Sequence, residues 1–181
     1  EQRGDCGGKM QIKTQRLTLE PLGTKFLVST HAYASDPELT RLRVFLPTDD
    51  LAETERYLKK CEAEAAKERP QFYEMAVLLD GRHNGSVSAY LEENGTAWEL
   101  GWIISREAHG CGYAAEAARA LMEYCLENTG IRRFIAHCDS ENSASQRVMQ
   151  KLGLSFAEER SGRKNRGSDE VRSEMMFERV F

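Results

Sequence analysis

The 181-residue chain lacks paired cysteines and long apolar runs. Its five cysteines include no C-x-x-C pair, and an odd number does not complete a disulfide framework. This usage disfavours a zinc site and favours reducing surroundings. No apolar stretch approaches the roughly 20 residues of a membrane span, and the first residues do not resemble a secretory signal. We therefore expect a cytoplasmic protein that has no metal site and no membrane partner.

An excess of charge of either sign is also missing. The chain carries 25 Lys and Arg against 29 Asp and Glu, a net charge of −4, so we expect no direct nucleic-acid partner. With 40% hydrophobic and 30% charged residues, the length fits one globular domain with its own core. We expect this domain at residues 10–181, and we expect the Gly-rich residues 1–9 to be a disordered tail or a remnant of cloning.

The most informative segment is a glycine-containing loop. Gly110 and Gly112 lie between an extended stretch at 97–104 and an amphipathic stretch at 114–126. The order strand, glycine loop and helix start points backbone N–H groups and the positive end of a helix dipole at one spot. A residue without a side chain lets the backbone approach an anion closely. The segment therefore predicts a site for a phosphorylated cofactor.

The first half reads as strands around a helical region. Strands are predicted at 17–22, 72–79, 85–91 and 97–104, with turns at 80–82 and 93–95 closing two hairpins. The helical region extends to about Lys67 and is broken near Pro37 and Pro47. A capped helix is predicted to start within 48–53. Its apolar face is predicted to be Leu51, Thr54, Tyr57, Leu58 and Cys61.

The second half has sharper periodicity. The helix after the glycine loop is predicted to bury Ala114, Ala117, Ala118, Leu121, Met122, Cys125 and Leu126 and to end at 128–130. A strand is expected at 133–138. A helix is expected from Asn142 to Gly153, with Ala144, Val148 and Leu152 inward.

Residues 156–160 and 174–180 are expected to form a terminal hairpin around a basic loop at 160–166. That loop is either solvated or binds an acidic or ribosomal partner. Antiparallel strands followed by one βαβ crossover predict an α/β (α+β) fold: a mixed, mostly antiparallel sheet of about seven strands with helices on both faces.

Several motifs, in this order, resemble the GNAT acetyltransferase superfamily and its branch of ribosomal-protein N-terminal acetyltransferases (RimJ/RimL-like). They are Thr14-Gln-Arg-Leu-Thr-Leu-Glu-Pro-Leu22, Glu99-Leu-Gly-Trp102, Gly110-Cys-Gly-Tyr-Ala-Ala-Glu-Ala117, Asn142-Ser-Ala-Ser145 and Lys151-Leu-Gly-Leu154. The match runs from about residue 10 to the end. The resemblance implies the acyl-CoA N-acyltransferase fold, with a splayed sheet, and acetyl-CoA as co-substrate without a metal.

The resemblance also implies the residues that bind acetyl-CoA. The pyrophosphate would take N–H bonds from the loop residues His109, Gly110, Cys111, Gly112, Tyr113 and Ala114. The pantetheine arm would bond to the backbone near Ile103 and Ile104 as a pseudo-strand. Asn142 would hold a pantetheine amide. His109 departs from the Gln, Arg or aromatic residue usual in the family.

The chemistry requires a neutral amine, and deprotonation at pH 7 costs roughly 1 kcal/mol for an α-amine but about 4–5 kcal/mol for a lysine. The resemblance to this branch implies a protein or peptide N-terminal α-amine, including a ribosomal one, as acceptor in a ternary complex, and the lower deprotonation cost agrees. Glu99 is the candidate base. Met149 replaces the tyrosine that many family members use as acid, so Ser145 is the candidate donor to the thiolate. The family resemblance implies a homodimer.

Each assignment has an alternative. Glu99 can be a solvated sheet residue, Asn142 a helix cap and Ser145 an ordinary first-turn residue. The acceptor can be a polyamine, amino acid or antibiotic, and residues 31–71, which would select it, contain no motif. The fold can also serve non-catalytic acyl-CoA binding. The loop also fits the dinucleotide pattern G-x-G-x-x-A with Asp139 as ribose ligand, although the preceding hairpins disfavour it.

Overall fold

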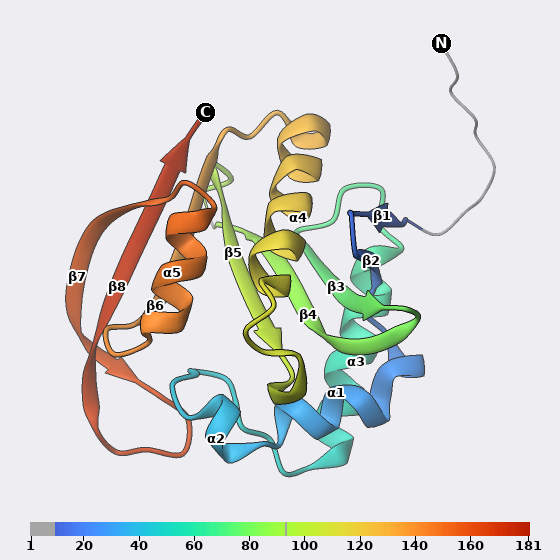
Figure 1. Cartoon of the computed structure of the whole chain (residues 1–181), viewed down its shortest axis with the longest axis horizontal. Helices are drawn as coiled ribbons and strands as arrows, with labels where there is room; N and C mark the ends of the chain where they lie inside the picture. The colour runs from blue at the N-terminus through green and yellow to red at the C-terminus, as the bar shows by residue number, and fades with distance from the viewer. Residues whose placement is uncertain (1–9, 93) are drawn as a thin grey trace.

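The computed structural model describes residues 10–92 and 94–181 (Figure 1). The described residues form one sheet in the order β1-β2-β3-β4-β5-β6-β8-β7, in which only β5 and β6 pair in parallel. The strands are β1 (Ile12–Lys13), β2 (Leu17–Pro21), β3 (Phe72–Leu79), β4 (Arg82–Leu91), β5 (Ala97–Ile104), β6 (Arg133–Asp139), β7 (Ser155–Lys164) and β8 (Val171–Val180). The mixed, mostly antiparallel sheet is confirmed, with short β1 as an additional strand. The predictions for residues 1–9 and for Glu93 lie outside the described residues.

Helices cover both faces of the sheet, as predicted (Figure 1). One face carries α4 (Tyr113–Thr129) and α5 (Ser143–Lys151), and the other carries α1 (Leu27–Ala34) and α3 (Leu51–Ala65), with short α2 (Pro37–Thr40) after α1. The expected breaks are confirmed: Asp36 and Asp50 accept hydrogen bonds from the N–H groups that start α2 and α3. No helix in the part of the chain that the structure describes is long and apolar enough to cross a membrane.

The main core lies between α4 and the sheet. Ala117, Ala118, Leu121, Met122 and Cys125 are buried on the predicted face, whereas the terminal positions of that face are only half-buried. The alanines bring the helix close to the strands, and burying each large side chain contributes about 1.5–3 kcal/mol. The helix ends at Thr129, where Gly130 adopts φ of 70°. The helix that follows the glycine loop is therefore anchored along its length.

Two predicted helix faces are partly wrong. In α5, Ala144 is exposed and Met149 is fully buried instead, because the short helix is turned toward α4. In α3, Leu51 is 49% exposed because it is the first residue, two turns before Leu58, which packs on the sheet. Tyr57 is 37% exposed and extends toward polar groups of the sheet.

The predicted basic loop at 160–166 is also wrong, because most of it belongs to β7. The pairing of β7 with β8 continues to Lys164 and Val171, so the turn itself contains residues 165–170. Arg163 fits inside this hairpin because its guanidinium pairs with Glu174 and donates to the Leu42 carbonyl. Charge neutralisation within the protein thus lets a basic segment form a strand.

The sheet splits between its two parallel strands. Strands β5 and β6 pair only from Ala97 with Arg133 to Glu99 with Ile135. Beyond these positions β5 remains bonded to β4 as far as Ile104, and β6 to β8 as far as Asp139. The facing edges, residues 100–104 of β5 and 136–139 of β6, are hereafter called the notch. The predicted splay is confirmed.

Candidate active site

The glycine loop forms the start of α4 as predicted. Gly110 and Gly112 both have φ of 80°, a conformation that favours glycine, and Gly112 is the N-cap of the helix. The cap makes no side-chain hydrogen bond, and the first helical bond is donated by the Glu116 N–H to the Gly112 carbonyl. The N–H groups of Tyr113 and Ala114 precede that bond, so they are oriented out of the helix end. The loop follows the C-terminal end of β5, next to the notch (Figure 1).

His109 fastens this loop to the strand. Its Nε2 lies 2.6 Å from the Ile104 carbonyl oxygen, which can only accept, so Nε2 is the donor. Its backbone N–H donates to the Arg106 carbonyl over 3.1 Å. Both groups are therefore used within the protein, and His109 supports the loop rather than extending its set of free donors. Cys111, in contrast, is exposed.

An arginine that the sequence reasoning missed lies beside the loop. Glu116 accepts from the Thr14 hydroxyl over 2.7 Å and from the Arg16 Nε over 2.7 Å. Burial opposes ionisation of Glu116, but these hydrogen bonds outweigh it and lower its pKa. The guanidinium of Arg16 lies 4.6 Å from the centre of the Tyr113 ring, and a Cβ on Gly112 would lie 3.6 Å from it. The signal for Arg16 in the sequence was the motif Thr14-Gln-Arg16.

The hydrogen bonds of β5 alternate between its two sides. The Ser105 N–H donates to Asn84 over 2.8 Å at one end, and the Ala97 carbonyl accepts from Glu92 over 3.0 Å at the other. Antiparallel ladders bond every second residue, so odd-numbered residues of β5 are bonded to β4. The even-numbered residues direct their backbone groups toward β6 and, past Glu99, into the notch.

This alternation corrects one predicted contact. Ile103 pairs with Ser86, and its carbonyl points at Gly85, where a Cβ would collide with it. The Ile103 backbone is therefore committed to β4, and Trp102 takes its place at the notch together with Ile104. The Ile104 carbonyl accepts from His109. Its N–H has the orientation that a pseudo-strand ligand needs.

Asn142 and Ser145 lie at the start of α5, beside the end of β6. The Asn142 Oδ1 accepts from the Ser145 N–H over 3.1 Å, so its role as helix cap is confirmed. Within the described ranges, neither the Asn142 amide nitrogen nor the Ser145 hydroxyl has a hydrogen-bond partner. Both side chains are half-buried and remain available to a ligand. Met149 is buried at 0% exposure in the core and has no polar hydrogen to donate.

Glu99 lies at the last position of β5 that pairs with β6, and its side chain is on the face of the sheet opposite α4. Its Oε1 is 2.9 Å from Nδ1 of His137, which lies two residues beyond Ile135 on the splayed part of β6. The hydrogen bond to Glu99 raises the pKa of His137, against the effect of burial. The Glu99 side chain is 45% exposed, so solvent and ligands can reach the pair. Sequence reasoning found Glu99 but missed His137.

A second carboxylate lies on the same face. Glu74 of β3 is half-buried, and the Tyr90 hydroxyl donates to its Oε2 over 2.9 Å. Burial raises the pKa of Glu74 to about 7. On β4, Tyr90 pairs directly with Glu99 of β5, so the two carboxylates lie on neighbouring positions of one polar surface. The only signal in the sequence was a lone acid within the apolar strand 72–79.

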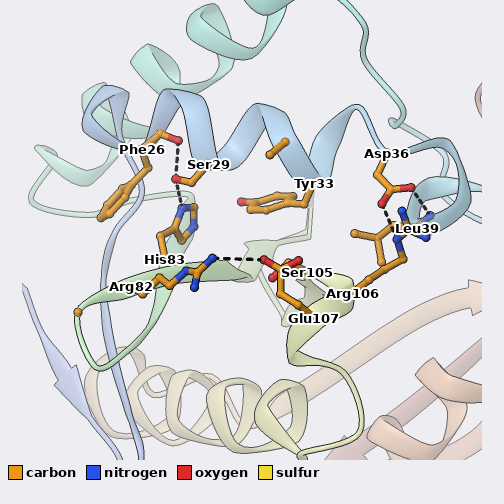
Figure 2. A pocket seen from close by; sticks show the side chains of 12 residues that line it. Phe26, Ser29, Tyr33, Asp36, Leu39, Arg82, His83, Ser105, Arg106 and Glu107 are labelled. Atoms are coloured by element: carbon orange, nitrogen blue, oxygen red, sulfur yellow. Dashed lines mark hydrogen bonds and ion pairs between the residues drawn. The ribbon is translucent and has the colours of Figure 1, made fainter.

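A cavity of about 470 Å³ lies near the end of β5, between α1, the β3–β4 turn and the segment after β5 (Figure 2). At one edge Arg106 pairs with Asp36 over 2.7 Å. At the other, His83 Nε2 donates to the Gly85 carbonyl over 2.7 Å and Nδ1 lies 2.6 Å from the Ser29 hydroxyl. Burial lowers the pKa of His83, which keeps the ring neutral. These side chains of the cavity are thus paired within the protein, whereas the backbone groups that face each other across the notch are not paired between β5 and β6.

Asp139 does not fit the role of a ribose ligand. It is fully buried, pairs with Arg172 over 2.5 Å and accepts from Asn165 over 2.8 Å. Burial opposes its ionisation, but the bonds from Arg172 and its other donors lower its pKa to about 2. Nearby, Arg166 pairs with Glu53 over 2.6 Å and Arg163 is buried. The dinucleotide interpretation is therefore wrong. Arg163 and Arg166 are paired within the protein, and binding of a partner by the basic segment stays a prediction.

The sequence profile of the family described as "Acetyltransferase (GNAT) domain" matches residues 16–155. The chain belongs to the GNAT acetyltransferase family. It is 28% identical over 147 residues to the uncharacterised N-acetyltransferase YnaD of Bacillus subtilis, covering 80% of this chain and 82% of the relative. It is therefore an acetyltransferase.

Solved GNAT structures share the fold. An acetyltransferase of Bacillus anthracis superposes with a TM-score of 0.81 at 24% identity, covering 94% of this chain and 98% of that one. RimL, a ribosomal L7/L12 alpha-N-protein acetyltransferase solved in complex with coenzyme A, superposes with a TM-score of 0.84 at 17% identity, covering 95% and 98%. At these identities the likeness extends to the fold alone.

Proposed function

We propose that this GNAT enzyme transfers the acetyl group of acetyl-CoA to the α-amine of a protein or peptide N-terminus by direct attack in a ternary complex. One observation carries the proposal: free N–H groups at the start of α4 lie next to the notch, whose inner end holds Glu99 and His137. A phosphate site, an unpaired strand edge and a proton acceptor thus follow one another along β5.

The residues present fit acetyl-CoA. The N–H groups of the loop residues Gly110, Cys111, Gly112, Tyr113 and Ala114 would bind the pyrophosphate, with Arg16 as a nearby cation. The backbone of Trp102 and Ile104 would bond to the pantetheine amides, and the free Asn142 amide would bind one more. Acetyl-CoA supplies the activated acyl group, and a backbone N–H of the notch would stabilise the oxyanion.

Glu99 and His137 would take the proton of the amine. Because His137 fixes the Glu99 carboxylate at 2.9 Å, the pair offers an oriented acceptor at the inner end of the notch. The Ser145 hydroxyl has no partner within the described residues and would donate to the leaving thiolate. An α-amine needs only roughly 1 kcal/mol for deprotonation at pH 7, which suits this single acceptor. The RimL-type neighbour acts on a protein α-amine and supports the same substrate class.

The test is acetyl-CoA-dependent release of free thiol with the peptide Ser-Ala-Ala-amide. We expect turnover that saturates with the peptide and a product heavier by one acetyl group. The matched control is the same peptide with its N-terminus already acetylated, which should give no release above background. Equal release with both peptides would mean that the enzyme hydrolyses acetyl-CoA, and the proposal would be wrong.

A further inference from the structure

We propose that Arg43 binds a carboxylate of the acceptor, so that the preferred substrate is a primary amine with a carboxylate a few bonds away. The inference rests on the proposed acetyl transfer and specifies its substrate class. Arg43 follows α2 and lies in the part of the chain for which the sequence offered no motif.

The Arg43 guanidinium is half-buried and unpaired. Among residues 10–92 and 94–181 it takes part in no salt bridge and no side-chain hydrogen bond. Burial and repulsion from Arg163 lower its pKa to about 10, so it remains a cation at neutral pH. Leaving a desolvated charge without a partner is costly, and proteins rarely do so unless a ligand supplies the partner.

Arg43 lies over the face of the sheet that bears Glu99 and His137. It interacts electrostatically with Glu74 of β3 on one side and with Arg163 of β7 on the other, and β4, β5, β6 and β8 lie between these strands. Its backbone is held at both ends: its N–H donates to Thr40 over 2.9 Å and its carbonyl accepts from Arg166 over 3.0 Å. The cation is therefore carried by fixed backbone on the face that bears Glu99 and His137.

The buried Tyr33 hydroxyl supports the site. Thr30 and Tyr33 of α1 are 2% and 6% exposed, and their hydroxyl oxygens are buried without a hydrogen-bond partner in the described residues. Figure 2 shows the Tyr33 ring beneath α1, on its sheet-facing side. The Tyr33 hydroxyl lies near the hydroxyls of Thr30 and of Ser86 on β4, and it interacts with Arg43. A guanidinium with the Tyr33 hydroxyl beside it is suited to a carboxylate.

Glu74 does not neutralise Arg43. The two groups are more than 4.0 Å apart, because no salt bridge between them is present, and Tyr90 already donates to Glu74. With its pKa at about 7, the Glu74 carboxyl is partly protonated at neutral pH and repels an anion only in part. Arg163, the other nearby cation, is paired with Glu174. Arg43 is thus the cation that a ligand can use.

The experiment compares thiol release with Ser-Asp-Ala-amide and Ser-Asn-Ala-amide, which differ only in charge. Wild type should favour the Asp peptide in kcat/KM by about tenfold, the effect of one charge-assisted hydrogen bond. Arg43→Gln should abolish the preference by slowing the Asp peptide, and Arg43→Lys should keep part of it. Free serine against serinamide separates a free amino acid from a peptide side chain as the source of the carboxylate.

Arg41→Gln is the matched control, because Arg41 is exposed two residues away and carries the same charge. It should keep the preference. Thermal unfolding adds a readout for folding: Arg43→Gln should not lower the Tm, because it removes an unpaired cation. A lower Tm with equal losses for both peptides would assign Arg43 a structural role and overturn the inference.

Equal rates of wild type with both members of each pair would overturn the inference while leaving the proposed acetyl transfer intact. No thiol release with any of the four acceptors would overturn the proposed function itself.

Discussion

The two faces of the sheet are built differently. The face under α4 and α5 is apolar, and the proposed cofactor site at its rim consists of backbone groups of the glycine loop and of β5. The face under α1 and α3 carries half-buried polar side chains, among them Glu74, Tyr90, Glu99 and His137. The proposed acetyl-CoA site is thus defined by chain conformation, whereas the proposed site of the acceptor amine is defined by side chains from separate segments.

Replacing Glu99 by Gln should have the largest effect among the side chains. It removes the proposed proton acceptor, so kcat should fall by about 100-fold or more. The acetyl-CoA Kd should stay unchanged, because the loop is untouched. Since Glu99 raises the pKa of His137, an NMR titration of His137 should show a lower value in the variant.

Glu159→Gln is the matched control, an exposed glutamate on β7. Near-wild-type turnover of Glu99→Gln would remove the acceptor role from this carboxylate.

Replacing Glu74 by Gln tests the polar face through stability. The pKa of Glu74 in the fold is about 7, above its usual 4.5, so the folded state binds the proton more tightly. The carboxyl therefore costs stability as pH rises from 4.5 through 7, and Gln avoids this cost. Relative to Glu74→Gln, wild type should lose about 2 kcal/mol in urea unfolding between pH 5 and pH 8.

The exposed Glu68→Gln variant should show no such trend. A difference between wild type and Glu74→Gln that stays constant with pH would place Glu74 in open solvent and weaken the contrast between the faces.

Replacing Arg16 by Gln should have the smallest effect. Arg16 is 42% exposed and already paired with Glu116, so it supplements the backbone donors. Binding of acetyl-CoA should weaken by about threefold, with kcat unchanged. Lys13→Gln, at an exposed neighbouring position, controls for net charge. Complete loss of acetyl-CoA binding in Arg16→Gln would mean that this side chain, and not the loop backbone, contributes most of the affinity for acetyl-CoA.

The same contrast explains what could be predicted. The glycine loop, α4 and the Asn142 cap depend on residues close together in sequence, so periodicity and turn chemistry located them. His137 meets Glu99 only through the register of two parallel strands, and that register is not visible in either strand alone. The expected contact of the Ile103 backbone with pantetheine differs for a related reason. Whether the backbone of a strand residue bonds to one neighbouring strand or faces the other depends on the pairing register, and here Ile103 pairs with Ser86 of β4.

Charge gave the weakest signal in the sequence. Arg163 and Arg43 both look like ordinary surface arginines in sequence. Yet Arg163 is paired inside the β7–β8 hairpin, and Arg43 is half-buried without a side-chain partner among the described residues. Asp139 likewise resembled a ribose-binding residue because it ends a strand. Its carboxylate instead accepts hydrogen bonds from Arg172 and Asn165, which are more than 25 residues away in sequence. Burial and pairing over such separations arise from the fold and cannot be deduced from local pattern.

The most direct test of a cofactor site in the glycine loop is calorimetric titration of wild type and Gly112→Val with acetyl-CoA. Gly112 has φ of 80°, which valine does not tolerate, and its N–H belongs to the proposed phosphate site. The control is Gly162→Val, which strains a glycine at φ of 96° on β7, away from the loop. We predict micromolar binding by wild type and Gly162→Val and none by Gly112→Val. Equal affinity in all three proteins would contradict a cofactor site built from the backbone of this loop.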